Sequence, residues 1–296
     1  MIDTICLSGG GIKGITYISA LEYLEKEKYL SIDKINTFVG TSSGAILGFL
    51  LSIGYTLDEM KEFVLNFNFS KLEPDINCNI FLSKYGIDDG IKMMTTIRTF
   101  LVEKLQLEDI TFQQLYDLKG KTLKIFTTNY TLGRSEIFSH ETTPDVSILL
   151  AVRMSLSVPF LFTPVEYNDC YYVDGALTYN FGLNYCNPET TLGLAIIQKK
   201  INKLDSFHGY FSNLLCITLD SISLNSLRQE EKYKKFNYIE ITCQLKDGLK
   251  FCIDVEVIKE LLEEGETFAK KYFSNFVSKI IVEELVNKTI ENYPSK

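Results

Sequence analysis

The sequence predicts an α/β fold of three layers, in which a central, mostly parallel sheet is flanked by helices. Apolar runs typical of strands alternate with helical patterns through the first half of the chain, as a βαβ layout requires. Two short glycine motifs each join such a run to a helical pattern. The composition, 46% hydrophobic and 23% charged, is that of a globular protein with a sizeable core.

The chain of 296 residues contains no internal repeat, low-complexity tract or linker marked by a change of composition. Its length lies within the range of one large α/β domain. We therefore expect a single domain over residues 1–296, with the chemical motifs in 1–181 and further strands and a helical cover in 182–296.

The first half of the chain predicts strands and helices in order. Ile18, Leu21 and Leu24 recur at helical spacing between charged residues, which indicates an amphipathic helix. A polar stretch around Pro74 is expected to form a mobile loop or lid. The expected elements are a strand at 5–7, a helix at 15–27, a strand at 37–39, helices at 44–53, 57–67 and 88–105, and a strand at 122–129.

The second half begins with a helical pattern at 146–154 that must stop near Pro159. The apolar run 171–173 predicts a short strand that ends at Asp174 and Gly175. The strand pattern then continues at 192–197, 214–219 and 238–242, and two helices, at 254–272 and 275–287, are expected to close the chain.

Charge and cysteine usage exclude several classes of function. A net charge of −8 and a pI near 5.0 argue against a nucleic-acid partner and against broad electrostatic adhesion to anionic membranes. Seven cysteines without a C-x-x-C pair indicate reduced thiols and no zinc site. The sequence shows no N-terminal leader and no apolar run near the roughly 18 residues that span a bilayer, so we expect a cytoplasmic protein.

The segment 40–44 (GTSSG) carries the first chemical signal. Strand, tight turn and helix form the context in which the serine of G-x-S-x-G, here Ser42, becomes an exposed nucleophile. The helix start would direct its positive end at an alkoxide forming there. Gly40 and Gly44 would leave room for a strained turn and for close packing of helix on strand. The pentapeptide is common, so a simple turn of small residues is the alternative.

The run of Gly9, Gly10 and Gly11 supplies consecutive backbone N–H groups at the start of another helix. Such a loop can accept an oxyanion or a phosphate. A dinucleotide fingerprint competes, because Gly9, Gly11 and Gly14 fit G-x-G-x-x-G. That fingerprint needs an acidic residue at the end of the next strand, whereas Asp33 precedes the strand. We therefore rank the oxyanion interpretation above the nucleotide one.

The base is uncertain at this level, because the chain has only two histidines, His140 and His208. One interpretation is a triad in the order Ser42, Asp174, His208. Another is a dyad in which Asp174 is the direct base, since it ends an apolar strand and Gly175 would let its carboxylate reach Ser42. A plain Asp-Gly hairpin turn is the third interpretation.

Together these motifs resemble those of the patatin-like phospholipases. Segment 8–14 (SGGGIKG) is similar to the oxyanion loop of that family, 40–44 to its nucleophile elbow, 174–176 (DGA) to its D-G-G/A motif, and 151–160 (AVRMSLSVPF) to the segment that precedes the aspartate. The four motifs occur in the right order over residues 1–181. Ser8 stands where many members have Asp, and Ala176 where many have Gly, but neither departure removes a catalytic group.

The resemblance implies hydrolysis of a lipid ester of the phospholipase A or lysophospholipase type, through an acyl-enzyme. It implies a catalytic dyad of Ser42 and Asp174, with no metal and no other cofactor. The implied oxyanion donors are Gly10 and Gly11, with Gly9 and the Ser43 N–H as helpers. Lys13 would contact a phosphate headgroup, with a solvated surface lysine as the alternative.

The expected partner is a phospholipid or other lipid ester, met through peripheral membrane contact, while an activating protein partner is unknown. That contact would come through Phe- and Tyr-rich loops or through the C-terminal helix with Phe268, Tyr272 and Phe276, whose alternative role is packing on the core. Two other functions stay open: a general carboxylesterase using His208, and a non-catalytic lipid-binding member of the fold.

Overall fold

The computed structural model describes residues 1–73, 81, 83–197, 210, 214, 217–218, 235–245 and 248–292. Its strands are β1 (Thr4–Leu7), β2 (Thr37–Thr41), β3 (Gly86–Asp88), β4 (Thr122–Asn129), β5 (Arg134–Phe138), β6 (Phe160–Phe162), β7 (Val165–Tyr167), β8 (Cys170–Asp174), β9 (Thr191–Ile197) and β10 (Asn237–Thr242). Its α-helices are α1 (Thr16–Lys26), α2 (Ser43–Ile53), α3 (Leu57–Asn66), α5 (Ile91–Leu105), α6 (Phe112–Lys119), α7 (Ile148–Ser155), α8 (Ala176–Tyr179) and α10 (Val255–Asn292). Short 3-10 helices are η1 (Gly11–Ile15), η2 (Ile32–Lys34), η3 (Phe69–Leu72) and η4 (Leu183–Tyr185).

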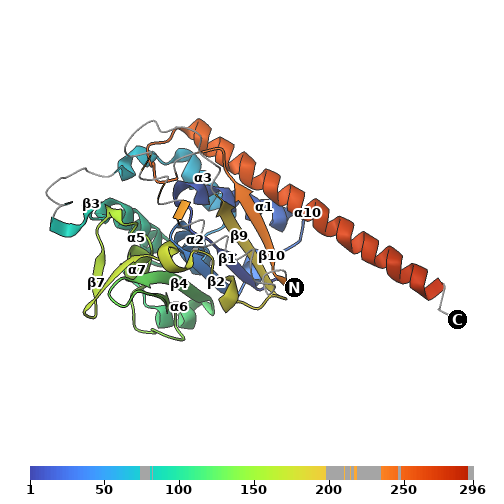
Figure 1. Cartoon of the computed structure of the whole chain (residues 1–296), viewed down its shortest axis with the longest axis horizontal. Helices are drawn as coiled ribbons and strands as arrows, with labels where there is room; N and C mark the ends of the chain where they lie inside the picture. The colour runs from blue at the N-terminus through green and yellow to red at the C-terminus, as the bar shows by residue number, and fades with distance from the viewer. Residues whose placement is uncertain are drawn as a thin grey trace.

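A sheet with the strand order β10-β9-β1-β2-β4-β8-β7 forms the centre of the molecule (Figure 1). The strands from β10 to β4 run parallel to one another. β8, β7 and β5 add antiparallel pairs, with β5 on β4. The mostly parallel sheet confirms the predicted α/β fold, and β3 and β6 form a separate pair.

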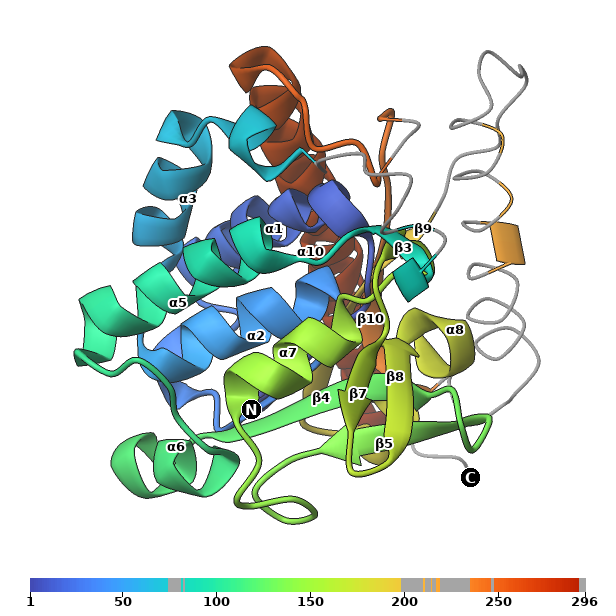
Figure 2. The ribbon, with the colours of Figure 1, turned by 90° about the vertical axis from the view of Figure 1, so that its left-hand side faces the viewer.

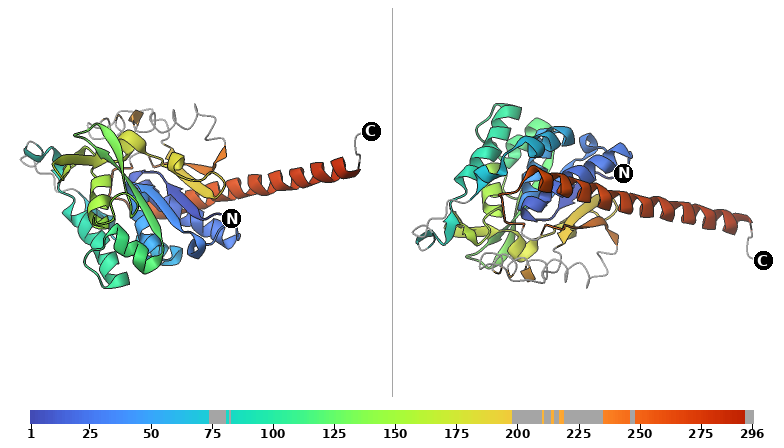
Figure 3. Two further views of the ribbon diagram at one scale, coloured as in Figure 1. Left: turned by 90° about the horizontal axis from the view of Figure 1, so that it is seen from below. Right: turned by 90° about the horizontal axis from the view of Figure 1, so that it is seen from above.

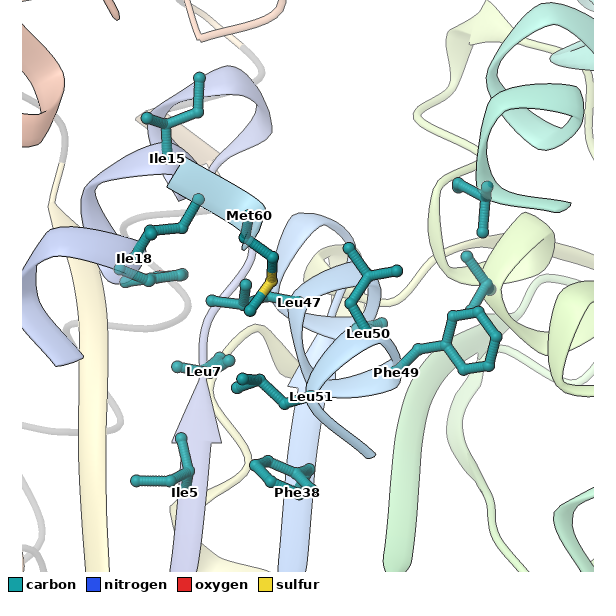
Figure 4. Packing of buried hydrophobic residues seen from close by; sticks show 14 of the residues in the cluster. Ile5, Leu7, Ile15, Ile18, Phe38, Leu47, Phe49, Leu50, Leu51 and Met60 are labelled. Atoms are coloured by element: carbon teal, nitrogen blue, oxygen red, sulfur yellow. The ribbon is translucent and has the colours of Figure 1, made fainter. Parts of the chain in front are cut away.

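Alternate residues of the central strands face two different cores. On β1, Ile5 and Leu7 join the larger cluster, whereas Cys6 joins a smaller cluster on the opposite face. Phe38 and Val39 of β2 divide in the same way, because successive side chains of a strand point to opposite faces. Figure 4 shows Ile5, Leu7 and Phe38 packed beneath α2. Both faces of the sheet are therefore covered.

The helices over the larger core surround α2. Figure 2 shows α2 among α1, α5 and α7, with α3 beyond α1. α3 and α6 each begin with a capping box, in which Thr56 pairs with Glu59 and Thr111 with Gln114. The box at Thr111 and the left-handed Gly120 after α6 were available in the sequence, although we did not predict this helix.

A single helix, α10, closes the described chain where we predicted two. Ser274 and Asn275 lie inside it, because neither residue breaks a helix as Pro or Gly would. α10 crosses α1 and then continues past the body of the molecule (Figures 1 and 3). Tyr272 and Phe276 pack on Tyr29, which agrees with the core-packing alternative for this face. No helix in the described part of the chain has the length and apolar character needed to cross a bilayer.

Two other expectations fall on or near residues outside the described set. The polar stretch from Pro74 lies outside it, and so does most of 214–219. Positions 214, 217 and 218 are helical, and the Thr218 hydroxyl donates to the Leu214 carbonyl at 2.9 Å. The predicted strand is therefore wrong at those positions, because periodicity alone does not separate a short apolar strand from a helix.

Candidate active site

Ser42 lies at the junction of β2 and α2, where the GTSSG pattern predicts a sharp turn. Its backbone angles, φ 54° and ψ −121°, fall in a region that residues with a side chain rarely adopt. Its carbonyl accepts a hydrogen bond from the Ala45 amide at 2.9 Å. The turn therefore places the serine at the positive end of a helix of 11 residues.

Asp174 reaches Ser42 because two strands share one edge of β4. β5 occupies the other edge of the same part of β4, so β2 and β8 lie end to end along the first edge. β2 ends with Thr41 opposite Phe126, and β8 ends with Asp174 opposite Thr127. Consecutive positions of β4 thus bring the serine and the carboxylate together.

The step from Asp174 to Gly175 is not the hairpin turn that we considered. Gly175 has φ −62°, which any residue adopts. A Cβ on Gly175 would lie 2.7 Å from the carbonyl carbon of Phe126 and 3.0 Å from Cγ2 of Thr41. Glycine is needed here because the backbone after Asp174 presses against β4 and the end of β2.

The Asp174 carboxyl group is enclosed, with only 2% of the residue exposed. Burial raises its pKa to about 7, while the Ala176 amide and the Ser42 hydroxyl lower it to smaller extents. The Ala176 amide donates to Oδ1 at 2.9 Å, and Oδ2 has no hydrogen-bond partner among the described residues. A carboxyl group with a pKa near neutrality and one unengaged oxygen beside a serine suits a general base.

The glycine loop, residues 9–14, packs directly on the turn that carries the serine. A Cβ on Gly9 would lie 3.0 Å from Cβ of Ser42, and a Cβ on Gly14 would lie 2.9 Å from Cβ of Ser43. Larger residues at these positions would push the two motifs apart. The two sequence motifs therefore form one site.

The amides of the glycine loop are not equivalent. Gly9 donates its N–H to Oδ1 of Asn180 at 2.9 Å, so this amide is already engaged. Among the described residues, the amides of Gly10 and Gly11 have no such partner. Ser43 is the first residue of α2, where the amide has no acceptor within the helix. Asn180 follows α8 without any motif, so the sequence did not reveal it.

Lys13 differs from both sequence interpretations. It is 1% exposed, and a Cβ on Gly248 would lie 3.3 Å from its Cε. A residue enclosed in this way is not a solvated surface lysine, and its burial does not fit the predicted contact with a headgroup. The residues next to Lys13 in the sequence cannot reveal that Gly248, far along the chain, packs against it.

Two serines near the end of α7 support the serine–aspartate pair, a role that the sequence did not assign. The Ser42 amide donates to Oγ of Ser155 at 2.8 Å, and that hydroxyl donates to the Phe126 carbonyl at 2.7 Å. The Ser157 carbonyl accepts the Asp174 amide at 2.9 Å. One short segment therefore holds the backbone of both functional residues.

An apolar cavity, which we call the channel, is lined at one point by Ser42 and contains about 1060 Å³ of empty space, a volume that includes space open to solvent. Ile15, Ile18 and Met60, which Figure 4 shows on one side of α2, are among the residues that line it. Three helical segments each line it with positions i, i+3, i+4 and i+7: Ser43, Ile46, Leu47 and Leu50 of α2; Met60, Phe63 and Val64 of α3 with Phe67, the residue that follows it; Met93, Thr96, Ile97 and Phe100 of α5.

Of the two histidines, His140 lies among the described residues and takes no part in the site. His140 stacks on Tyr116 with ring centroids 4.0 Å apart, and it does not line the channel. His208 lies outside the described residues. Within the described part of the chain, no three His, Cys, Asp or Glu side chains are grouped to hold a metal ion.

A family model for patatin-like phospholipase matches residues 5–186. The chain belongs to the patatin-like phospholipase family. It is 36% identical over 190 residues to Probable lipid hydrolase 463L of Invertebrate iridescent virus 6, an alignment that covers 61% of this chain and 62% of that relative. It is 27% identical over 290 residues to protein R571 of Acanthamoeba polyphaga mimivirus, covering 94% of this chain and 95% of the relative.

Among solved structures, VipD from Legionella pneumophila has the same patatin-like fold as this chain. The TM-score is 0.60 at 17% sequence identity, and the match covers 93% of this chain and 67% of VipD. That similarity concerns the fold alone. The family match includes the glycine loop, the Ser42 turn and Asp174, so the resemblance found in the sequence is confirmed at the level of the family.

Proposed function

We propose that this chain is a lipid acyl hydrolase of the phospholipase A or lysophospholipase type, with Ser42 as nucleophile and Asp174 as base. The observation that carries this proposal is the position of Ser42. Its side chain lies beside the buried carboxyl group of Asp174, and the residue also lines the apolar channel. A site of that kind favours an ester with a long apolar acyl group over a polar substrate.

In the proposed acylation, Oγ of Ser42 attacks the ester carbonyl carbon while Asp174 accepts the hydroxyl proton. The positive end of α2 and the amides of Gly10, Gly11 and Ser43 would stabilise the oxyanion. Collapse of the tetrahedral intermediate breaks the bond to the alcohol, which takes the proton from Asp174 and leaves. The acyl group remains on Ser42 as an ester.

In deacylation, Asp174 would accept a proton from water as its oxygen attacks the acyl-enzyme, and the proton then returns to Oγ of Ser42. The raised pKa of Asp174 favours both roles, because it narrows the difference between the pKa of the carboxyl group and the pKa of the hydroxyl group that gives up its proton. Ionised Asp174 is the active form. The rate constant kcat/KM is therefore expected to fall as the pH decreases through about 7.

The deciding experiment is fatty-acid release from mixed phospholipid vesicles in the presence of a chelator. Ser42→Ala and Asp174→Asn should abolish release, whereas His208→Ala and the exposed control Asp145→Asn should retain it. A fluorophosphonate probe should label the wild type and not Ser42→Ala.

Loss of release in His208→Ala would instead support a carboxylesterase-type triad. No release by the wild type, with or without a chelator, would contradict the hydrolase proposal and favour a lipid-binding member of the fold. A pH profile that stays flat from pH 5 to 8 would contradict Asp174 as the base.

A further inference from the structure

The channel runs along α2, away from the nucleophile. Ser42 precedes the first residue of this helix, and the α2 positions that line the channel continue as far as Leu50. At about 1.5 Å of rise per residue, Leu50 lies about 12 Å from Ser42 along the helix axis, and the last residue, Ile53, about 16 Å. A chain attached at Ser42 therefore has a defined depth available.

Aromatic rings close the far end of that path. The ring of Phe100 contacts Phe63 with centroids 4.6 Å apart and Tyr55 with centroids 5.3 Å apart. Tyr55 directly follows Gly54, the residue that caps the C-terminal end of α2. Phe100 and Phe63 therefore lie at the end of α2 opposite to Ser42. We call these two residues the end wall.

The end wall is anchored from behind. The Tyr55 hydroxyl donates to the Phe100 carbonyl at 3.1 Å and to Oε2 of Glu103 at 3.2 Å. Phe100 is 8% exposed and Tyr55 is 6% exposed, so these two rings are enclosed, whereas Phe63 beside them is partly buried. A ligand that reaches the wall along α2 must stop or bend.

Among the described residues, the polar side chains that line the channel are Ser42 and Ser43 at one end and Thr96 of α5. Thr96 is the polar residue that α5 contributes, and its hydroxyl donates to the Lys92 carbonyl of its own helix at 3.0 Å. Its methyl group is therefore the part left for contact with a ligand. Because buried polar groups without partners are costly, the channel suits the hydrocarbon part of a substrate.

We propose that the end wall of Phe63 and Phe100 sets an upper limit on the acyl chain, so that the enzyme prefers medium-length fatty acyl esters. A peptide residue of three bonds spans at most about 3.6 Å, so an extended chain advances about 1.2 Å per bond. The depth along α2 then accommodates about ten to thirteen carbons. This inference rests on the proposed function, because it takes Ser42 as the point of attachment.

The test is a competition within one mixed micelle. Phosphatidylcholines with saturated chains of increasing length are present at equal mole fraction, and released fatty acids are quantified by mass spectrometry. The ratio of released acids gives relative kcat/KM values that are independent of how the enzyme meets the interface. Each methylene bound in the channel should raise the relative kcat/KM by up to about fourfold. The relative kcat/KM should therefore rise with acyl-chain length until the chain reaches the end wall, and rise no further beyond it.

Variants of the wall supply the decisive comparison. Phe100→Ala and the milder Phe100→Leu should move the preferred length up by at least one two-carbon step and raise the share of long chains. Leu50→Phe should move it down, because the larger ring narrows the last part of the channel. The matched control is Phe49→Ala, a buried phenylalanine of α2 that does not line the channel.

A profile that keeps rising to long chains in the wild type, or a shift of equal size in Phe49→Ala, would overturn the inference. Failure of the proposed function has a different signature, since no fatty acid of any length would be released. In that case the end wall can still be tested by binding. Free fatty acids of increasing length are added to Ser42→Ala, and the rise in melting temperature is measured for each. The increase in melting temperature must be largest for medium-length fatty acids in Ser42→Ala, and for longer fatty acids in the double variant that also carries Phe100→Leu.

Discussion

Asp174 is a residue whose position in the fold moves the pKa of its carboxyl group to near neutral pH. Its carboxyl group is held against Ser42 in a buried place, and burial raises its pKa from 3.8 to about 7. The folded state therefore keeps this proton to a higher pH than the unfolded chain does. Ionising the group in the folded state costs free energy, and under the proposed mechanism the protein accepts this loss of stability because ionised Asp174 is the base.

Asp174→Asn should make the protein more stable above neutral pH while removing activity. The folded pKa is raised, so the free energy of unfolding of the wild type falls as the pH increases from about 4 to about 7. Asp174→Asn has no ionisable group at this position, so its free energy of unfolding does not fall in this way. Its advantage should grow from near zero below pH 4 to at most about 4 kcal/mol above pH 7, measured by urea denaturation across the pH range.

The exposed Asp145 supplies the control for this stability measurement. Asp145→Asn should change the free energy of unfolding by a similar small amount at every pH. If Asp174→Asn shows no growing advantage over the wild type between pH 4 and 8, the carboxyl group is not desolvated in the way described.

Ser155 links the Ser42 amide to the Phe126 carbonyl through one hydroxyl. Ser155→Ala would leave both groups buried without that partner, which costs about 1–3 kcal/mol. Because the turn that carries Ser42 would relax without this hydrogen bond, we also expect kcat to fall roughly 10- to 100-fold, with little change in KM. Steady-state kinetics on lipid micelles would measure both constants.

Ser52→Ala is the matched control for Ser155→Ala, because Ser52 is also buried and its hydroxyl donates to the Phe49 carbonyl at 2.7 Å. It should lose similar stability and keep kcat. Ser155→Thr keeps a hydroxyl and should recover part of the rate. Equal kcat losses in Ser52→Ala and Ser155→Ala would contradict a positioning role.

At the scale of elements, the crossing of α1 and α10 depends on one glycine. A Cβ on Gly265 would meet the carbonyl oxygen of Thr16, and Oγ of Ser19 is also in the way. Beyond the crossing, Tyr29 contacts Phe276 with ring centroids 4.8 Å apart. The two helices therefore approach closely at Gly265, and Tyr29, which follows α1, packs on α10 farther along.

Gly265→Ala should destabilise the protein, although Ala is normally favoured over Gly inside a helix by about 1 kcal/mol. Overpacking at the crossing is expected to cost about 1–3 kcal/mol and to outweigh that propensity. Chemical denaturation of Gly265→Ala should thus show a lower midpoint. Glu263→Ala, at an exposed position of the same helix, should leave the midpoint nearly unchanged. A higher midpoint for Gly265→Ala would contradict the close crossing.

At the scale of the whole molecule, a net charge of −8 limits how the protein meets lipid. An anionic surface repels such a protein, and salt screens that repulsion. Entry of a substrate chain into the channel must then rely on apolar contact. Aggregated lipid is the expected substrate form, because a lipid tail would desolvate the site.

Fatty-acid release from zwitterionic vesicles should therefore exceed release from vesicles in which part of the lipid is anionic, at low ionic strength. The difference should shrink as salt is added. Release that is faster on anionic vesicles and is suppressed by salt would contradict this expectation and indicate a local basic surface. The same assay on dispersed short esters should give a lower specific activity.

The element order was largely predictable because the hydrophobic periodicities are local. The strands β1, β2, β4, β8, β9 and β10 and the helices α1, α2, α3 and α5 follow from such patterns, and the GTSSG and glycine-rich segments mark two of their junctions, whereas the short strand β7 was not predicted. The single helix α10 and the helix α6 were not predicted. Residues that weakly favour the start or end of a helix do not decide its bounds within a short stretch of sequence. The burial of Lys13 was equally out of reach, because its cover is distant in sequence.

The sequence by itself determined the α/β fold class, the family motifs and the candidate residues Ser42 and Asp174, since each rests on a short run of neighbouring residues. Only the tertiary structure decided that β2 and β8 share one edge of β4 and bring the two together. It also decided that Asn180 engages the Gly9 amide and that three helices enclose an apolar channel. Those features depend on strand register and on packing between distant segments, which no local pattern of residues encodes.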